Sequence, residues 1–277
     1  MAETSLFHKG SFYQIDPSDF MNEWLHNLPV WWMALILFAI VYLVTGAIFA
    51  VVILLGRGER ARVFKGASPG LLSPLGTIFG LLVVFTVFQV WGDFDRARLA
   101  VDREASALRT VVLLASSFPG EPETQIRNLV RRHIDEAVTT EWTEMAKRSA
   151  SLKVAPPALA EVLRLTLSLT PQSQGQIVAQ REIVAALENS MDARRQRINL
   201  SRSTVNWVKW TCMFAQAACA LIAIAMVHSD NRAAAAIAMG IFASGVAVCA
   251  LLIASHDQPF TGEISVKPDV LLQVRPE

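Results

Sequence analysis

The chain has 277 residues, of which 53% are hydrophobic and 18% are charged, and the apolar residues are concentrated in blocks. This composition excludes an ordinary soluble domain and places much of the chain in lipid. The formal net charge of +1 provides no global basic field, so nothing in the charge balance points to nucleic acid as a partner.

The first 29 residues carry acidic side chains and lack the basic, apolar and small-residue regions of a cleaved signal peptide. Trp24, Trp31 and Trp32 mark the approach to a membrane, because indole rings favour the headgroup level. We therefore expect residues 1–29 to be an interfacial segment.

Four apolar segments are each long enough to cross a hydrocarbon core of roughly 30 Å. The first covers residues 30–55 and the second residues 71–91, where Gly76 and Gly80 form a small-residue pair suited to close helix contact. The third and fourth, residues 207–227 and 233–255, are close enough to form a helical hairpin. The sequence predicts an all-α, polytopic membrane protein. Its predicted units are the interfacial segment 1–29, transmembrane helices one and two in 30–91, a helical extramembrane domain 92–206, transmembrane helices three and four in 207–255, and a C-terminal tail 256–277.

Four crossings put both termini and the extramembrane domain on one side of the membrane. The short loop 56–70 is basic, which by the positive-inside rule favours a cytoplasmic loop. The basic residues that flank the domain are more numerous, although they belong to a long segment to which the rule applies weakly. We expect a cell inner-membrane protein whose domain and termini are cytoplasmic.

Prolines divide the extramembrane segment into pieces that have helical periodicity. Apolar residues recur at three- and four-residue steps in residues 123–150 and again in residues 176–200. No proline or glycine separates residues 176–200 from the third span, and the second span runs directly into a charged helical segment. Spans two and three are therefore both expected to continue as long helices beyond the bilayer.

The second span has two unlike faces at about 100° per residue. One face carries small side chains. Along the other face the side chains change from apolar to hydroxyl, amide and finally charged. Around an axis of several copies, this graded stripe would form a hydrophobic constriction followed by polar rings. The predicted constriction residues are Phe79, Leu82 and Phe85, and the predicted polar lining residues are Thr86, Gln89, Asp93 and Arg96. Alternatively, Thr86 and Gln89 bond to a neighbouring helix and the charges form a solvated helix end.

No motif predicts catalysis. The five histidines and three cysteines form no metal-ligand spacing, and there is no phosphate loop, dinucleotide fingerprint or nucleophile elbow. Asp257, after the fourth span, is either a proton or ion site or a polar turn residue before Pro259, and the turn is favoured. We expect no enzymatic activity, metal or cofactor.

Two blocks of the sequence resemble a family of bacterial and plastid membrane proteins described as bestrophin-like. The first, residues 73–109, is a span that runs into a charged helix with an E-A-S-A-L core beginning at Glu104, and Glu141 and Trp142 follow it. The second, residues 257–271, contains a D-x-P-F-x-G motif. The motif residues of this second block are Asp257, Pro259, Phe260 and Gly262.

The resemblance implies an oligomeric α-helical protein in a class whose better-known relatives are pentameric ion channels. In those relatives the second transmembrane helix lines the pore and bulky apolar side chains gate it. The leading hypothesis is a homo-oligomeric channel for small inorganic ions in the lipid bilayer, with the sign of the ion undetermined. The alternative is a non-conducting membrane scaffold or sensor whose helical domain binds a partner.

Overall fold

The computed structural model describes residues 28–55, 69–153, 155–229 and 231–277, and within these ranges every regular element is a helix. Most of the predicted interfacial segment and of the basic 56–70 loop lies outside the described residues. Of the predicted interfacial tryptophans, Trp31 and Trp32 are described. Their rings are exposed and lie 4.4 Å apart at the start of the first long helix.

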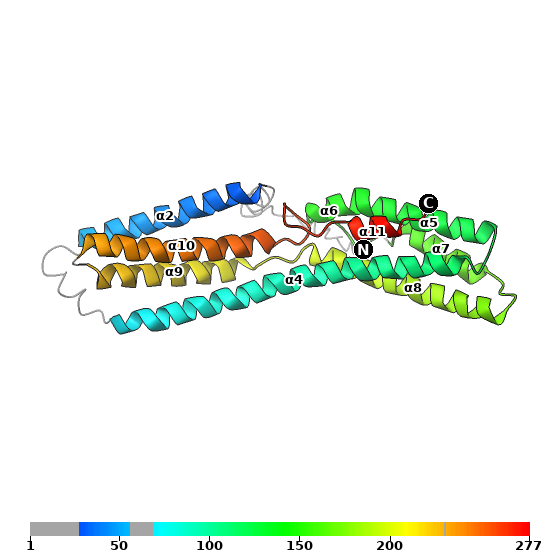
Figure 1. Cartoon of the computed structure of the whole chain (residues 1–277), viewed down its shortest axis with the longest axis horizontal. Coiled ribbons are helices and arrows are strands. Elements are labelled where there is room, and N and C mark those ends of the chain that lie inside the picture. Colours follow the sequence, from blue (N-terminus) through cyan, green and yellow to red (C-terminus); the bar gives the residue numbers. More distant parts are fainter. Residues whose placement is uncertain (1–27, 56–68, 154, 230) are drawn as a thin grey trace, which may run out of the picture.

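All four predicted spans are confirmed as helices long and apolar enough to cross a membrane. They are α2 (Val30–Leu55), α4 (Leu72–Ala115), α9 (Trp207–Val227) and α10 (Arg232–His256), and a short 3₁₀ turn, η1 (Pro69–Leu71), leads into α4. In Figure 1 these helices lie side by side at one end of an elongated molecule. The predicted hairpin is present, and the side chain of Asn231 caps α10 by accepting the N–H groups of Ala233 and Ala234 at 3.1 Å.

The prediction that the second span continues beyond the bilayer is confirmed. Helix α4 has 44 residues, about 66 Å at 1.5 Å per residue, and forms part of both ends of the molecule (Figure 1). Its only proline, Pro74, lies in the first turn, where the missing N–H needs no helical partner. The charged second half is rich in alanine, arginine and leucine, which favour an uninterrupted helix.

The corresponding prediction for the third span is wrong, because α8 (Gln174–Leu200) ends seven residues before α9 begins. The intervening linker, residues 201–206, is rich in serine and threonine. Its last residue, Asn206, is the N-cap of α9 and accepts the Val208 N–H at 2.9 Å. Side chains that compete for backbone hydrogen bonds thus end the helix without glycine or proline.

The remaining helices form the extramembrane end together with the second half of α4. They are α5 (Glu121–Glu136), the π-helical turn η2 (Ala137–Glu141), α6 (Trp142–Ala146), α7 (Pro157–Ser168), α8 and α11 (Asp269–Val274). The predicted helical stretch 123–150 is therefore a helix with a π-turn that ends at Ala146. Fully buried apolar residues such as Leu108, Ile134 and Leu187 join α4, α5 and α8 in one core.

Candidate functional site

Helix α4 has one face buried within the protomer and an opposite face that the described residues leave uncovered. Along the membrane half, Phe79, Val83 and Val90 are buried, whereas Phe85 and Phe88 are 65% and 68% exposed. The uncovered face continues past the bilayer. Its exposed residues at helical spacing are Thr77, Leu81, Phe85, Phe88, Asp95, Leu99, Arg103 and Ser106.

The three predicted constriction residues do not lie on one face. Phe79 is 8% exposed, and its ring centre is 5.5 Å from that of Phe242 on α10. Leu82 is half-buried at the edge between the two faces. Phe85 is the member of the set that points away from the protomer, so the three side chains do not face one common direction.

The predicted polar residues bond within the protomer. Thr86 donates to the carbonyl of Leu82 at 2.8 Å on its own helix, and Gln89 accepts a hydrogen bond from Lys209 on α9. Asp93 is 8% exposed, accepts from Ser203 Oγ at 2.7 Å and pairs with Arg96. Bonding to a neighbouring helix, the alternative considered from the sequence, thus describes Gln89, whereas Thr86 bonds to its own helix. A pore-lining role for the set stays a prediction.

The small-residue pair Gly76 and Gly80 makes no close contact inside the protomer. A methyl group added at either position would meet no heavy atom within 4 Å. Among the described residues, no helix of the protomer makes close contact at this pair.

Asp257 lies where α10 ends, and its side chain is 4% exposed. Its Oδ1 accepts the Val205 N–H at 2.6 Å, so it reaches the 201–206 linker from a position 52 residues away in the chain. Burial raises the pKa of Asp257, the Val205 hydrogen bond and the charge of Arg148 lower it, and the nearby Asp93 carboxylate raises it. The result is a pKa of about 6, above the ordinary 3.8.

The rest of the D-x-P-F-x-G segment packs on the extramembrane domain. The Phe260 ring is buried and meets the Trp142 ring edge-on at 5.5 Å, and Trp142 Nε1 donates to the carbonyl of Val266 at 3.3 Å. Gly262 has φ +83°, a left-handed conformation that favours glycine. The segment therefore ties the end of α10 to α6.

A buried ion network lies at the centre of the domain. Glu104 and Arg197 are both fully buried, and Arg197 Nε donates to Glu104 Oε2 at 2.8 Å. Arg197 Nη2 also donates to Glu141 Oε2 at 3.0 Å, and Arg194 Nε donates to the other oxygen of Glu141 at 2.8 Å. His133 Nε2 lies 3.2 Å from Glu104 Oε1. The network joins α4, α5, η2 and α8.

Glu104 lies 13 residues beyond Trp91, about 20 Å along α4 and outside the apolar segment. Burial alone would raise the pKa of its carboxyl. The charge of Arg197 and the hydrogen bonds from His133 and Arg197 outweigh burial and lower the pKa to about 2. Glu104 is therefore ionised at neutral pH. The sequence identified Glu104 but not its partners, which lie on other helices.

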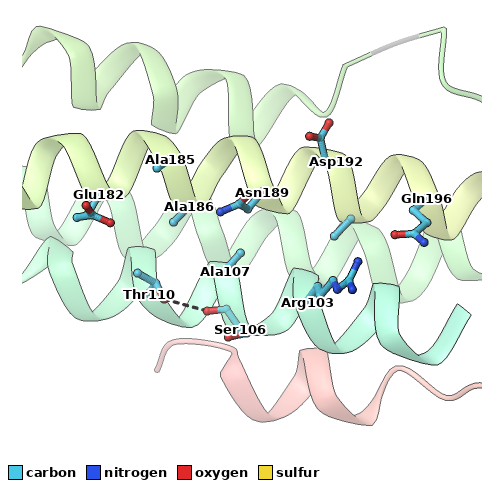
Figure 2. A pocket seen from close by; sticks show the side chains of 11 residues that line it. Arg103, Ser106, Ala107, Thr110, Glu182, Ala185, Ala186, Asn189, Asp192 and Gln196 are labelled. Carbon is cyan, nitrogen blue, oxygen red and sulfur yellow. Dashed lines mark hydrogen bonds between the residues drawn. The ribbon is translucent and has the colours of Figure 1, made fainter. Parts of the chain in front are cut away.

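An open groove of about 470 Å³ runs between α4 and α8 at the extramembrane end. Figure 2 shows polar side chains of both helices along it, including Arg103 and Thr110 of α4 and Glu182 and Asp192 of α8. Alanines at positions 107, 186 and 193 keep the two helices close. In the part of the chain that the structure describes, no three His, Cys, Asp or Glu side chains gather as a metal site.

Comparisons with known proteins agree with this architecture. A crystal structure of a bacterial bestrophin homologue from Klebsiella pneumoniae, a point variant, matches with a TM-score of 0.68 at 11% identity, covering 86% of this chain and 97% of that chain. Another point variant of the bestrophin homologue from that organism matches with a TM-score of 0.53 at 13% identity, covering 86% of this chain and 94% of that chain. A crystal structure described as a membrane protein, also a variant, matches with a TM-score of 0.58 at 11% identity, covering 82% of this chain and 94% of that chain.

At these identities the solved structures show a common fold. A search of curated proteins found no match. The Bestrophin-like domain matches residues 38–271, which is most of the chain and includes all four spans apart from the first turns of α2. The chain belongs to the Bestrophin-like family.

Proposed function

We propose that the protein is a homo-oligomeric ion channel whose pore is lined by the uncovered face of α4. The observation that carries the proposal is the continuity of this face. It is apolar at Leu81, Phe85 and Phe88 and mainly polar from Asp95 onward, where Leu99 is the apolar exception, without a break in the helix. Lipid is a suitable environment for the apolar part of this face but not for the polar part. Water is suitable for the polar part but not for the apolar part.

A ring of identical chains accounts for both halves. Copies in one membrane share the same height along the bilayer normal, so the apolar part of each α4 meets the apolar parts of the others. The polar parts meet in the same way. Such a ring produces an apolar constriction followed by a wider polar region, which is an arrangement that channels use to gate and select. Family membership and the class of channels that the family resembles support the same conclusion.

Exposure revises the roles of the residues expected from the sequence. Phe85, with its neighbours Leu81 and Phe88, is proposed to form the constriction. Leu82, Gln89 and Arg96 lie at the edge of the uncovered face and are proposed to line its flank. We propose that Phe79, Thr86 and Asp93, on the buried face of α4, hold the helix in place and do not line the pore.

Ion flux in liposomes tests the proposal. Phe85→Ala should raise the flux several-fold, because it removes a bulky apolar side chain from the constriction. Phe214→Ala is the matched control, since Phe214 is a partly exposed aromatic residue on α9 that stacks on Trp210. Absence of flux under every ionic condition, or an equal response of the two variants, would contradict the proposal.

The sign of the permeant ion is left to measurement, because Asp95 and Arg103 place opposite charges on the same face. Reversal potentials in asymmetric salt would determine it. We further propose that the extramembrane domain and both termini are cytoplasmic in a cell inner membrane, and that the channel catalyses no reaction. Protease accessibility of the domain in sealed, oriented vesicles tests the orientation.

A scaffold or sensor is the second candidate, and the groove between α4 and α8 favours it, since a partner helix could occupy that space. Co-purification of a stoichiometric protein partner, together with no flux, would select this function over the channel.

A further inference from the structure

The 201–206 linker is held by carboxylates from two other parts of the chain. Asp93 of α4 accepts from Ser203 Oγ at 2.7 Å, and Asp257 at the end of α10 accepts from Val205 N–H at 2.6 Å. The linker is the covalent connection between α8 in the extramembrane domain and span α9. This junction is therefore one of the routes by which movement of the domain can reach the spans.

Both carboxylates are buried, at 8% exposed for Asp93 and 4% for Asp257. Burial and the nearby negative charge of Asp93 both oppose ionisation of Asp257. Arg148 lies two residues after α6 in a left-handed conformation with φ 57°, and it supplies a positive charge that acts on Asp257. When Asp93 and Asp257 are both ionised, the junction therefore holds two buried negative charges.

We propose that Asp257 is a proton-dependent switch of this junction: protonation of Asp257 stabilises the observed closed linker, whereas its ionisation loosens the linker and changes ion flux. The part concerning flux rests on the proposed channel function. The part concerning the linker does not.

The effect of pH on the linker follows from the difference in the pKa of Asp257 between the closed and the solvated state. A carboxyl whose pKa is about 6 in the closed junction and near its ordinary 3.8 when solvated binds a proton more tightly in the closed junction. Falling pH therefore favours closure, and rising pH through about 6 favours opening. The neutral acid still accepts the Val205 N–H through its carbonyl oxygen, so the contact survives while the cost of a buried charge disappears.

The other charged groups of the junction have their own partners. Arg96 pairs with Asp93, Arg202 of the linker donates to the carbonyl of Ala150, and the His256 ring meets Phe94 edge-on at 5.9 Å. Among the described residues, the charge of Arg148 lowers the pKa of Asp257 and the charge of Asp93 raises it.

Hydrogen exchange of the full-length protein in detergent or nanodiscs tests the switch. After correction for intrinsic rates, amide protection of residues 201–206 should fall about tenfold between pH 5 and pH 7.5. Asp257→Asn, a permanently neutral mimic of the acid, should give high protection at both pH values. Asp135→Asn is the matched control, because Asp135 is an exposed acid paired with Arg275. Protection that does not change with pH, or a pH response retained by Asp257→Asn, would overturn the switch.

A second variant keeps the test decisive if Asp257→Asn does not fold. Asp93→Asn removes the neighbouring charge that raises the pKa of Asp257. The midpoint of the protection change should then move to lower pH, and an unmoved midpoint would overturn the assignment.

Flux measurements separate the switch from the channel. With pH varied on the side that holds the domain, flux should differ between pH 5 and pH 7.5, and Asp257→Asn at pH 7.5 should match the unmodified protein at pH 5. Conduction without a pH response would overturn the link to flux. No conduction at all would overturn the channel, while hydrogen exchange would still decide the switch.

Discussion

The buried charges show how a single residue in this protein depends on its partners. Removing water from Glu104 or Arg197 is costly, and each is tolerated because it forms an ion pair with the other and has further hydrogen bonds. The Arg197 guanidinium also lies 5.0 Å from the centre of the Trp142 ring, so the aromatic face adds a cation–π contact. Losing one partner should therefore harm the fold more than losing both.

Arg197→Met tests this dependence. It leaves the Glu104 carboxyl buried with His133 as its remaining close partner, and it should destabilise the domain by about 3–5 kcal/mol in denaturant unfolding. The double variant Glu104→Gln with Arg197→Met should recover part of the loss. Arg195→Met, which breaks an exposed pair with Asp192, should cost no more than about 1 kcal/mol. Equal losses in Arg195→Met and Arg197→Met would contradict the importance of burial.

The two shifted carboxyls should affect stability in opposite pH windows. Asp257, with its raised pKa, contributes stability that is complete below 3.8 and is lost as pH rises through about 6. Glu104, with its lowered pKa, contributes stability above 4.5 that is lost as pH falls through about 2, so it is constant from pH 6 to 8.

Thermal unfolding from pH 4 to pH 8 can measure the Asp257 contribution directly. The melting temperature of the unmodified protein minus that of Asp257→Asn should be largest at pH 4, decline through pH 6 and level off above pH 7. A difference that increases with pH would show that the carboxylate, and not the acid, is the favoured form in the folded protein.

At the scale of the element, α4 is the helix whose two faces have different surroundings along its whole length. The buried face follows the other spans and then the domain core, from Val83 through Val90 and Ala97 to Leu108. Between the two faces lie Gly76 and Gly80, where an added methyl group would meet no heavy atom of the described residues within 4 Å. We propose that these glycines permit contact between copies of the chain.

Gly80→Leu should accordingly weaken the oligomer while leaving the protomer folded. The new side chain would occupy space that is open in the protomer but needed for close approach of a second helix. Gly46→Leu is the matched control on α2, where the added side chain also meets open space. Light scattering of the detergent-solubilised proteins measures both. An unchanged oligomer in Gly80→Leu, or equal loss in both variants, would exclude this part of α4 from the subunit contact.

At the scale of the whole molecule, two ends of different chemistry share one continuous helix. The membrane end has uncovered apolar side chains that lipid can solvate, whereas the extramembrane end has its own buried core and ion network. Three connections join the ends: α4 itself, the 201–206 linker, and the segment from Asp257 to Val266 that packs on Trp142. A change at the domain can reach the spans through any of them.

The sequence by itself determined the number of spans, the uninterrupted course of α4 and the all-helical class. These features depend on local information: apolar runs of about 20 residues and helical periodicity are complete within each segment. The same local signals missed the end of α8, because the serine and threonine side chains of 201–206 compete for the backbone less visibly than glycine or proline does.

Only the tertiary structure decided which face of α4 is covered, because an apolar helix in lipid has no amphipathic pattern that separates a neighbouring helix from a lipid tail. It placed Phe79 against α10 and left Phe85 outside. It also brought Arg197 to Glu104 across 93 positions and Asp257 to Val205 across 52. Such contacts depend on how separate helices pack. Packing brings together residues far apart in the chain, and no regular pattern in the sequence marks them as partners.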